Sequence, residues 1–251
     1  SLTLVGPLGM MKGDWFQVYA PMQNENVYTN NWTGPFYGFE RVIETFEMTD
    51  TPHRLKPVNI YYHTYIASKR ASMASLHKAY GWAEEQLRQQ RLHPVFASEY
   101  IERVLDWRRA TVARTEQGLE LRGGRHLRQW RVDAGAPVPE LGVNAGLAGH
   151  QLHAGQRYLH ATKSIATYAA STRAGAGFYL ESANGRLLDW QRNGMEHRFR
   201  FAAHVPLQVR FVAPGCAHQP VAGQRSQRRE DRLDIEADPL GTHTVVLRCA
   251  G

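Results

Sequence analysis

"HRFRFAAHVPLQVRFVA", residues 197–213, contains two runs in which polar and apolar side chains alternate strictly. Successive side chains of a β-strand point to opposite faces of its sheet, so this alternation is typical of strands with one buried and one wet face. Pro206 lies between the runs and favours a turn there. The stretch therefore predicts two strands that each have one wet face, and it decides the fold class of the second half of the chain.

Similar short runs fill the sequence from residue 115 to the C-terminal end. They are separated by glycine, proline or asparagine at intervals of about ten residues. Regular short strands with frequent turns are the pattern of an antiparallel β-sandwich or jelly roll. We therefore predict an all-β domain over residues 115–251.

Residues 1–114 show a different periodicity. Apolar residues recur at helical spacing over Phe36–Thr49 and Lys69–Gln89, and a third helix is predicted over Glu99–Arg109. Runs rich in apolar and β-branched residues at Val58–Tyr62 and Pro94–Ser98 predict strands between these helices. Alternation of this kind indicates βα units around a parallel sheet, so the whole chain is expected to be α/β followed by all-β.

Composition excludes some classes of function. The chain has 251 residues, a net charge of +7 and a pI near 9.6, but its arginines are mostly scattered. Nucleic-acid binding usually requires a clustered basic face or an aromatic-basic motif, so we predict no nucleic-acid partner. No apolar stretch approaches the ~20 residues of a membrane span, so no transmembrane segment is predicted.

The two cysteines, Cys216 and Cys249, each follow a strand-like run, so they can meet across a sheet. In an oxidising compartment they are candidates for a disulfide, whereas in a reducing compartment they would be small buried thiols. Neither cysteine has the spacing of a metal site.

His63 follows the predicted strand in "VNIYYHTY", residues 58–65. The carboxyl edge of a parallel sheet is where catalytic groups collect, so His63 is the candidate catalytic residue. The alternative is a histidine whose nitrogens are satisfied near the rim of the core.

The segment Gly13–Gly38 is rich in aromatic and carboxamide side chains. Rings stack on sugar faces and amides pair with hydroxyl groups, so the segment predicts a sugar site. The alternative is a loop whose rings belong to the core and whose asparagines make turns. Together with Tyr62, the candidate substrate-binding residues are Asn24, Glu25, Tyr28 and Trp32.

Twelve histidines occur, but only His150 and His153 lie close enough in the sequence to suggest a ligand pair. Their spacing differs from that of common metal motifs, so we predict that both are surface or turn residues.

The runs "QVYAPMQNENVYTNNWTGPFYGFERVIETFEMTDTPHRLKPVNIYYHTYIASKRASM", residues 17–73, and "HPVFASEYIERVLDWR", residues 93–108, carry a resemblance. They resemble the latter part of the polysaccharide deacetylase domain of PelA-type proteins, which act in making the Pel exopolysaccharide. The β-rich remainder is similar to the C-terminal domain that follows it in those proteins.

The resemblance implies a fold, a cofactor and a reaction. Residues 1–114 would be the C-terminal portion of a deformed (β/α) barrel that holds a divalent metal, zinc being the first candidate. "IYYH" resembles the family motif whose histidine is the general acid, which would be His63, and Asp14-Trp15 would stand where the family has an Asp-Trp pair. The metal motifs themselves, an Asp-Asp strand end and His-x-x-x-His, are absent from this sequence. They are expected upstream in a longer parent protein, so no metal ligand is assigned here.

We therefore hypothesise that the parent protein is a periplasmic N-deacetylase that acts on an N-acetylhexosamine exopolysaccharide. This portion of it is expected to be inactive by itself. The implied partners are the glycan and a periplasmic or outer-membrane secretion protein. The alternative is a non-catalytic carbohydrate-binding or secretion-complex assembly module, in which His63 is structural.

Overall fold

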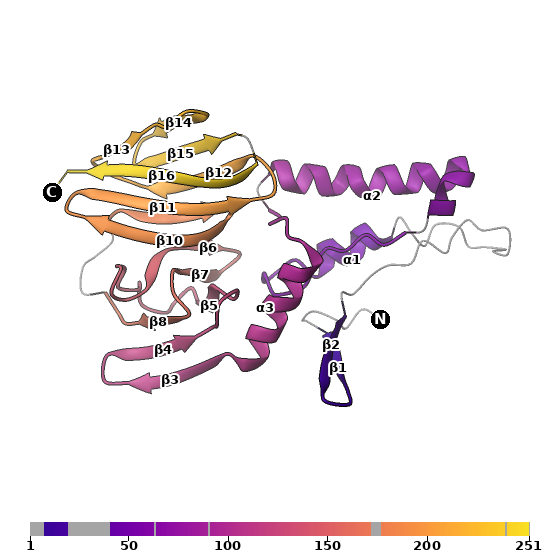
Figure 1. Cartoon of the computed structure of the whole chain (residues 1–251), viewed down its shortest axis with the longest axis horizontal. Coiled ribbons are helices and arrows are strands. Elements are labelled where there is room, and N and C mark those ends of the chain that lie inside the picture. The colour runs from indigo at the N-terminus through magenta and orange to yellow at the C-terminus, as the bar shows by residue number, and fades with distance from the viewer. Residues whose placement is uncertain are drawn as a thin grey trace. The chain divides into compact units, whose positions relative to one another are not determined.

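The computed structural model describes residues 8–19, 41–62, 64–89, 91–171, 177–238 and 240–250. The chain divides into two compact units, Ser1–Leu92 and His93–Gly251 (Figure 1). The change of sequence periodicity near residue 115 lies beyond this division, so the last helix belongs to the second unit and not to the α/β portion.

The first unit contains a hairpin and short helices. Strands β1 (Leu8–Lys12) and β2 (Trp15–Tyr19) pair antiparallel around a turn at Gly13, whose φ of 58° favours glycine. Helices α1 (Val42–Met48) and α2 (Arg70–Arg88) follow, with a 3₁₀ turn at Thr64–Ser68. The helix predicted over residues 69–89 is thus confirmed.

A small core joins α1 to α2. It consists of Val42, Phe46, Leu76 and Ala79, with Val58 and Ile60 packed against it. On α2, Ser72 and Ser75 are buried together with Leu76 and Ala79, while Tyr80 is exposed.

The strands predicted in the first half are wrong. Val58–Tyr62 has a single bridge residue, Ile60, and Pro94–Ser98 runs extended into a helix without sheet pairing. Val58 and Ile60 bury their side chains against the helices instead. The described part of the first unit has no parallel sheet, and the described strands close no barrel.

The second unit begins with α3 (Ala97–Arg109) and continues almost entirely in antiparallel strands. They are β3 (Thr111–Thr115), β4 (Gly118–Arg122), β5 (Gln129–Asp133), β6 (Leu147–His153), β7 (Gln156–Ala161), β8 (Ile165–Tyr168), β9 (Tyr179–Ala183), β10 (Arg186–Asn193), β11 (Glu196–Ala203), β12 (Leu207–Val212), β13 (Cys216–Gln219), β14 (Gln224–Arg229), β15 (Arg232–Ala237) and β16 (Gly241–Cys249). No helix is described after Arg109, which confirms the β-rich second half for the described residues.

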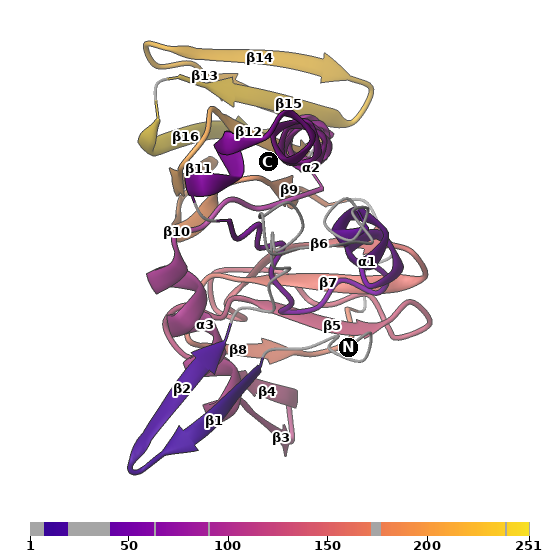
Figure 2. The ribbon, with the colours of Figure 1, turned by 90° about the vertical axis from the view of Figure 1, so that its right-hand side faces the viewer.

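Three sheets form the second unit. The seven-stranded sheet has the order β14-β15-β12-β9-β6-β7-β5, which Figure 2 follows from β14 at the top downward. A four-stranded sheet has the order β10-β11-β16-β13, and a three-stranded sheet has the order β3-β4-β8. Among the described pairings, the contact between Gly149 of β6 and Leu180 of β9 is parallel, and the other strand pairs are antiparallel.

The largest core lies between the four- and seven-stranded sheets. The predicted alternation of buried and exposed side chains is confirmed. Phe199 and Phe201 of β11 and Phe211 of β12 are fully buried. The intervening Arg198 and Arg200 are exposed on the outer face of the four-stranded sheet. Two antiparallel sheets therefore pack face to face across one apolar layer.

A second core lies on the other face of the seven-stranded sheet. Leu121 of β4 and Ala166 of β8 pack there with Leu147 and Leu159. Two neighbouring residues of β6 pack in different cores. Leu147 lies in this second core, and Ala148 lies in the larger core.

Gly149 permits the close approach of β6 and β9. A Cβ built on this residue would lie 1.9 Å from the carbonyl oxygen of Leu180. Any side chain at this position would therefore push the two strands apart.

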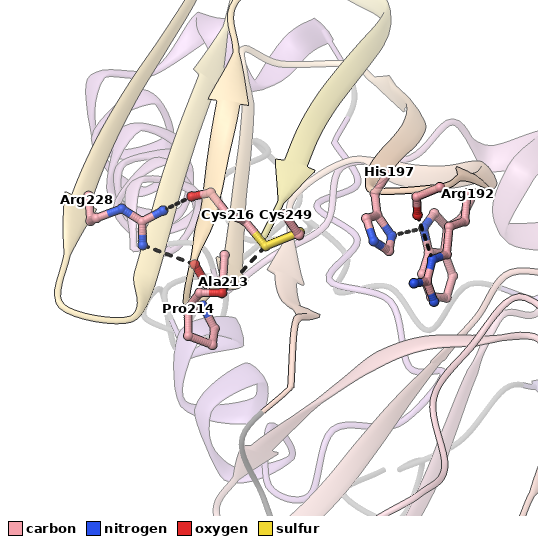
Figure 3. The surroundings of a disulfide bond; sticks show 9 residues. Arg192, His197, Ala213, Pro214, Cys216, Arg228 and Cys249 are labelled. Atoms are coloured by element: carbon pink, nitrogen blue, oxygen red, sulfur yellow. Dashed lines mark hydrogen bonds between the residues drawn. A yellow bond between two sulfur atoms is a disulfide. The ribbon is translucent and has the colours of Figure 1, made fainter. Parts of the chain in front are cut away.

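The cysteines form a disulfide across the pair β13 and β16 (Figure 3). Arg228 lies beside it and donates hydrogen bonds to the carbonyl oxygens of Ala213, at 3.1 Å, and of Cys216. The expected pairing of Cys216 with Cys249 is confirmed.

The alternation in β11 predicts very different costs at adjacent positions. Phe199→Ala should lower the free energy of unfolding by about 3–5 kcal/mol, because it leaves a cavity among aromatic rings. Arg200→Ala, on the exposed face, is the matched control and should change it by less than about 0.5 kcal/mol. Urea unfolding measures both, and equal costs would contradict the assignment of the two faces.

Candidate carbohydrate site and charged clusters

Tyr62 is the predicted site residue that the structure describes. Its ring lies edge-on to the ring of Tyr80 from α2, with 6.2 Å between the centroids. Both side chains are 41% exposed, and Tyr61 beside them is 37% exposed. The first unit therefore presents a group of tyrosine rings at its surface, immediately before His63 in the chain.

Helix α2 places polar groups beside this tyrosine pair. His77 and Glu84 stand three residues before and four after Tyr80, so they share its helix face, and both are exposed. Gly81 carries no side chain, and a Cβ built there would meet nothing within 4 Å. Burial raises the pKa of Tyr80, and the adjacent Tyr62 hydroxyl raises it further. Exposed rings flanked by donors and acceptors are suited to a sugar hydroxyl face.

The other predicted site residues cannot be placed beside Tyr62. His63, Asn24, Glu25, Tyr28 and Trp32 lie outside the described residues.

The Asp14-Trp15 pair lies at the tip of the hairpin. Asp14 is part of the turn, and Trp15 begins β2 opposite Lys12 with 81% of its surface exposed. The structure therefore gives this pair the setting of an exposed turn.

A first charged cluster anchors α3 within the second unit. Glu99 accepts hydrogen bonds from the Phe96 backbone N–H at 3.0 Å and from His204 Nε2 at 2.6 Å. Burial by itself would raise the pKa of Glu99, but these two donors outweigh it and the pKa is lowered. The Phe96 ring lies 4.4 Å from the His204 ring. The start of α3 is thus held to His204, the residue that follows β11, which is a structural role.

A second cluster surrounds His150, and here the surface prediction is wrong. The His150 side chain is buried in β6, with its ring stacked on Tyr179 at 4.7 Å and its Nδ1 3.3 Å from Nη1 of Arg157. Burial lowers the pKa of His150 to about 4, and the charge of Arg157 acts in the same direction. His153 ends the same strand and is half-buried.

The sequence does contain a signal for this cluster. "HAGQ", residues 153–156, has two turn residues with positive φ, Ala154 and Gly155. A two-residue hairpin loop fixes the register, so His150 faces Leu159 and lies diagonal to Arg157 on one face of the sheet.

Comparison with known proteins gives no relative. No family model matches the sequence, and no curated protein or solved structure matches it either. Among the described helices, none has the length and apolar composition needed to cross a membrane.

The lowered pKa of His150 predicts pH-dependent stability. The imidazole has a pKa of about 4 in the folded chain against an ordinary value of 6.5, so the unfolded chain binds more protons between these values. Stability is therefore complete above pH 6.5 and falls as the pH drops toward 4, by about 2 kcal/mol between pH 7 and pH 5. Urea unfolding at both pH values measures the loss. His150→Gln should remove this share of the pH dependence and leave the share that comes from the lowered pKa values of His93 and His160. An unchanged dependence in the variant would refute the assignment.

Proposed function

We propose that this chain is the C-terminal portion of a periplasmic polysaccharide N-deacetylase that acts on an N-acetylhexosamine exopolysaccharide. The observation that supports it best is the exposed pair of Tyr62 and Tyr80, directly before the candidate acid His63. In this proposal the rings bind the sugar face, and Asn24, Glu25, Tyr28 and Trp32 complete the groove. The first unit would belong to a partial deacetylase-type barrel.

His63 has one chemical task in this proposal. Hydrolysis of an acetamide turns its nitrogen into a leaving amine, which departs readily only when it is protonated. An imidazolium within hydrogen-bond reach of that nitrogen supplies the proton in the transition state. The protein's contribution is to hold the glycan on the tyrosine rings so that the amide meets His63.

In this proposal the metal of the implied reaction is held by ligands outside this chain. Deacetylases of the implied type use one aspartate and two histidines, and in the first unit Asp50 Oδ1 and His53 Nε2, which lie 3.5 Å apart, are side chains of these types. The sequence has no His-x-x-x-His motif. When bound, the metal would polarise the acetamide carbonyl, and its ligands would come from another segment of the parent protein.

His63→Ala tests the catalytic part of the proposal. In a polypeptide that joins this chain to the metal-binding half of the barrel, we expect the deacetylation rate to fall by about 10² to 10⁴, with metal content unchanged. His126→Ala, a half-buried histidine of the second unit, is the control and should keep the wild-type rate. A wild-type rate in the His63 variant would remove the catalytic assignment.

The alternative function is a non-catalytic carbohydrate-binding or secretion-complex assembly module. The second unit favours it, because this unit has its own large core and is compact without the first unit. In this case the glycan or a secretion protein would bind the β-sheets, and His63 would have no chemical role.

Glycan binding by the chain as it stands separates the two proposals. Tyr62→Ala and Tyr80→Ala should each weaken the binding of an N-acetylhexosamine oligomer by about three- to tenfold, since each removes a stacking ring. Trp107→Ala removes an exposed ring from the second unit and is the matched control. Isothermal titration measures all three. Binding that is lost with Trp107 but kept without the tyrosines would favour the binding module.

A further inference from the structure

Arg157 of β7 is a buried cation for which the described residues provide no anionic partner. The residue is 6% exposed, its Nε is enclosed without a hydrogen-bond acceptor, and its Nη1 meets His150 Nδ1. Within the part of the chain that the structure describes, no carboxylate forms an ion pair with it. A guanidinium stays charged at all physiological pH values, so this charge cannot be removed by deprotonation.

Other arginines of the same sheet are paired. Arg232 forms two hydrogen bonds with the Glu181 carboxylate, at 2.9 and 3.0 Å, and Arg210 forms one with Asp234 at 2.6 Å. Those two arginines are also far more exposed than Arg157. Of these three arginines, Arg157 is therefore the most deeply buried and the one that pairs with no carboxylate of the described residues, although a buried charge needs a counterion most.

Among the described residues, the surroundings of Arg157 supply no free negative charge, because the Glu181 carboxylate, which acts on His150 and Tyr179, is already paired with Arg232. His150 is neutral at pH 7, so it accepts a hydrogen bond but adds no negative charge. Burial raises the pKa of Tyr179 and of Tyr168, while the charge of Arg157 opposes the rise in both, which places the two rings near the guanidinium. Leu159 and its apolar neighbours fill the adjoining core.

We propose that Arg157, His150 and Tyr179 form a binding site for a monocarboxylate, either a small organic acid or the uronate group of an acidic glycan. The planar fork of a guanidinium matches a carboxylate in geometry and neutralises a single charge. A phosphate dianion fits less well, because one negative charge would stay uncompensated near Glu181. This site is independent of the deacetylase proposal.

Thermal unfolding of the whole chain tests the site. Sodium acetate, sodium D-glucuronate and sodium phosphate are each compared with sodium chloride at equal ionic strength. Each effective carboxylate should raise the melting temperature by about 3 °C at a tenfold excess over its Kd. A response to acetate identifies a small acid, and a stronger response to glucuronate identifies a uronate. A larger response to phosphate than to either would overturn the monocarboxylate assignment.

Arg157→Met tests whether the buried charge is responsible. Replacing an unpaired buried charge by an apolar side chain should leave the protein at least as stable as wild type in chloride, and should abolish the carboxylate response. Arg131→Met on the neighbouring strand β5 is the control, since Arg131 is exposed, and it should keep the response. An Arg157→Met protein that is still stabilised by carboxylates would overturn the proposal.

The imidazole of His150 gives a second readout that does not depend on a variant. A carboxylate bound to Arg157 offsets the positive charge that disfavours the imidazolium, so the pKa of His150 should rise from about 4 when acetate or glucuronate binds. Its ring proton shifts, followed by NMR over a pH titration, measure this change. An unchanged His150 titration, together with an unchanged melting temperature, would show that Arg157 has only a structural role.

Discussion

Contact among the aromatic rings of β11, β12 and β10 is the interaction on which the second unit depends. Phe199 lies 4.9 Å from Phe211 on the opposite sheet and 5.3 Å from Trp190 on the neighbouring strand. Because these rings belong to both layers, they join the two sheets in one apolar core. The disulfide closes the far end of the four-stranded sheet, where β13 contributes a single buried side chain, Cys216.

The first unit has a much smaller core, and this affects its surface. Phe46 stacks on Trp82 at 5.3 Å, and only a few branched residues join them. Two short helices cannot enclose every ring in this part of the chain, so Tyr61, Tyr62 and Tyr80 stay at the surface. Rings that are partly exposed are available for a flat polar ligand, which is why the proposed glycan site lies here.

Much of the fold could be predicted where one physical rule acts locally. Strict alternation located β11 and β12, helical periodicity located α2 and α3, and strand ends placed the cysteines opposite each other. The strand predicted at Val58–Tyr62 failed because an apolar run does not specify whether its backbone pairs with a strand or its side chains pack on helices. The prediction that His150 lies at the surface was wrong for a related reason, since the burial of this side chain depends on strands that are distant in the sequence. Of the candidate site, only Tyr62 can be compared with the structure, because the structure does not describe the other predicted residues.

Strand β6 is shared by two cores. Leu147 enters the core beneath β4 and β8, and Ala148 enters the core of phenylalanine rings, so adjacent peptide units are fixed from opposite sides. A rearrangement that loosens one core must pull on the backbone of the other. We therefore regard the three sheets of the second unit as one cooperative folding unit, in which partial opening is suppressed and the hydrogen-exchange protection of β6 should approach that of global unfolding.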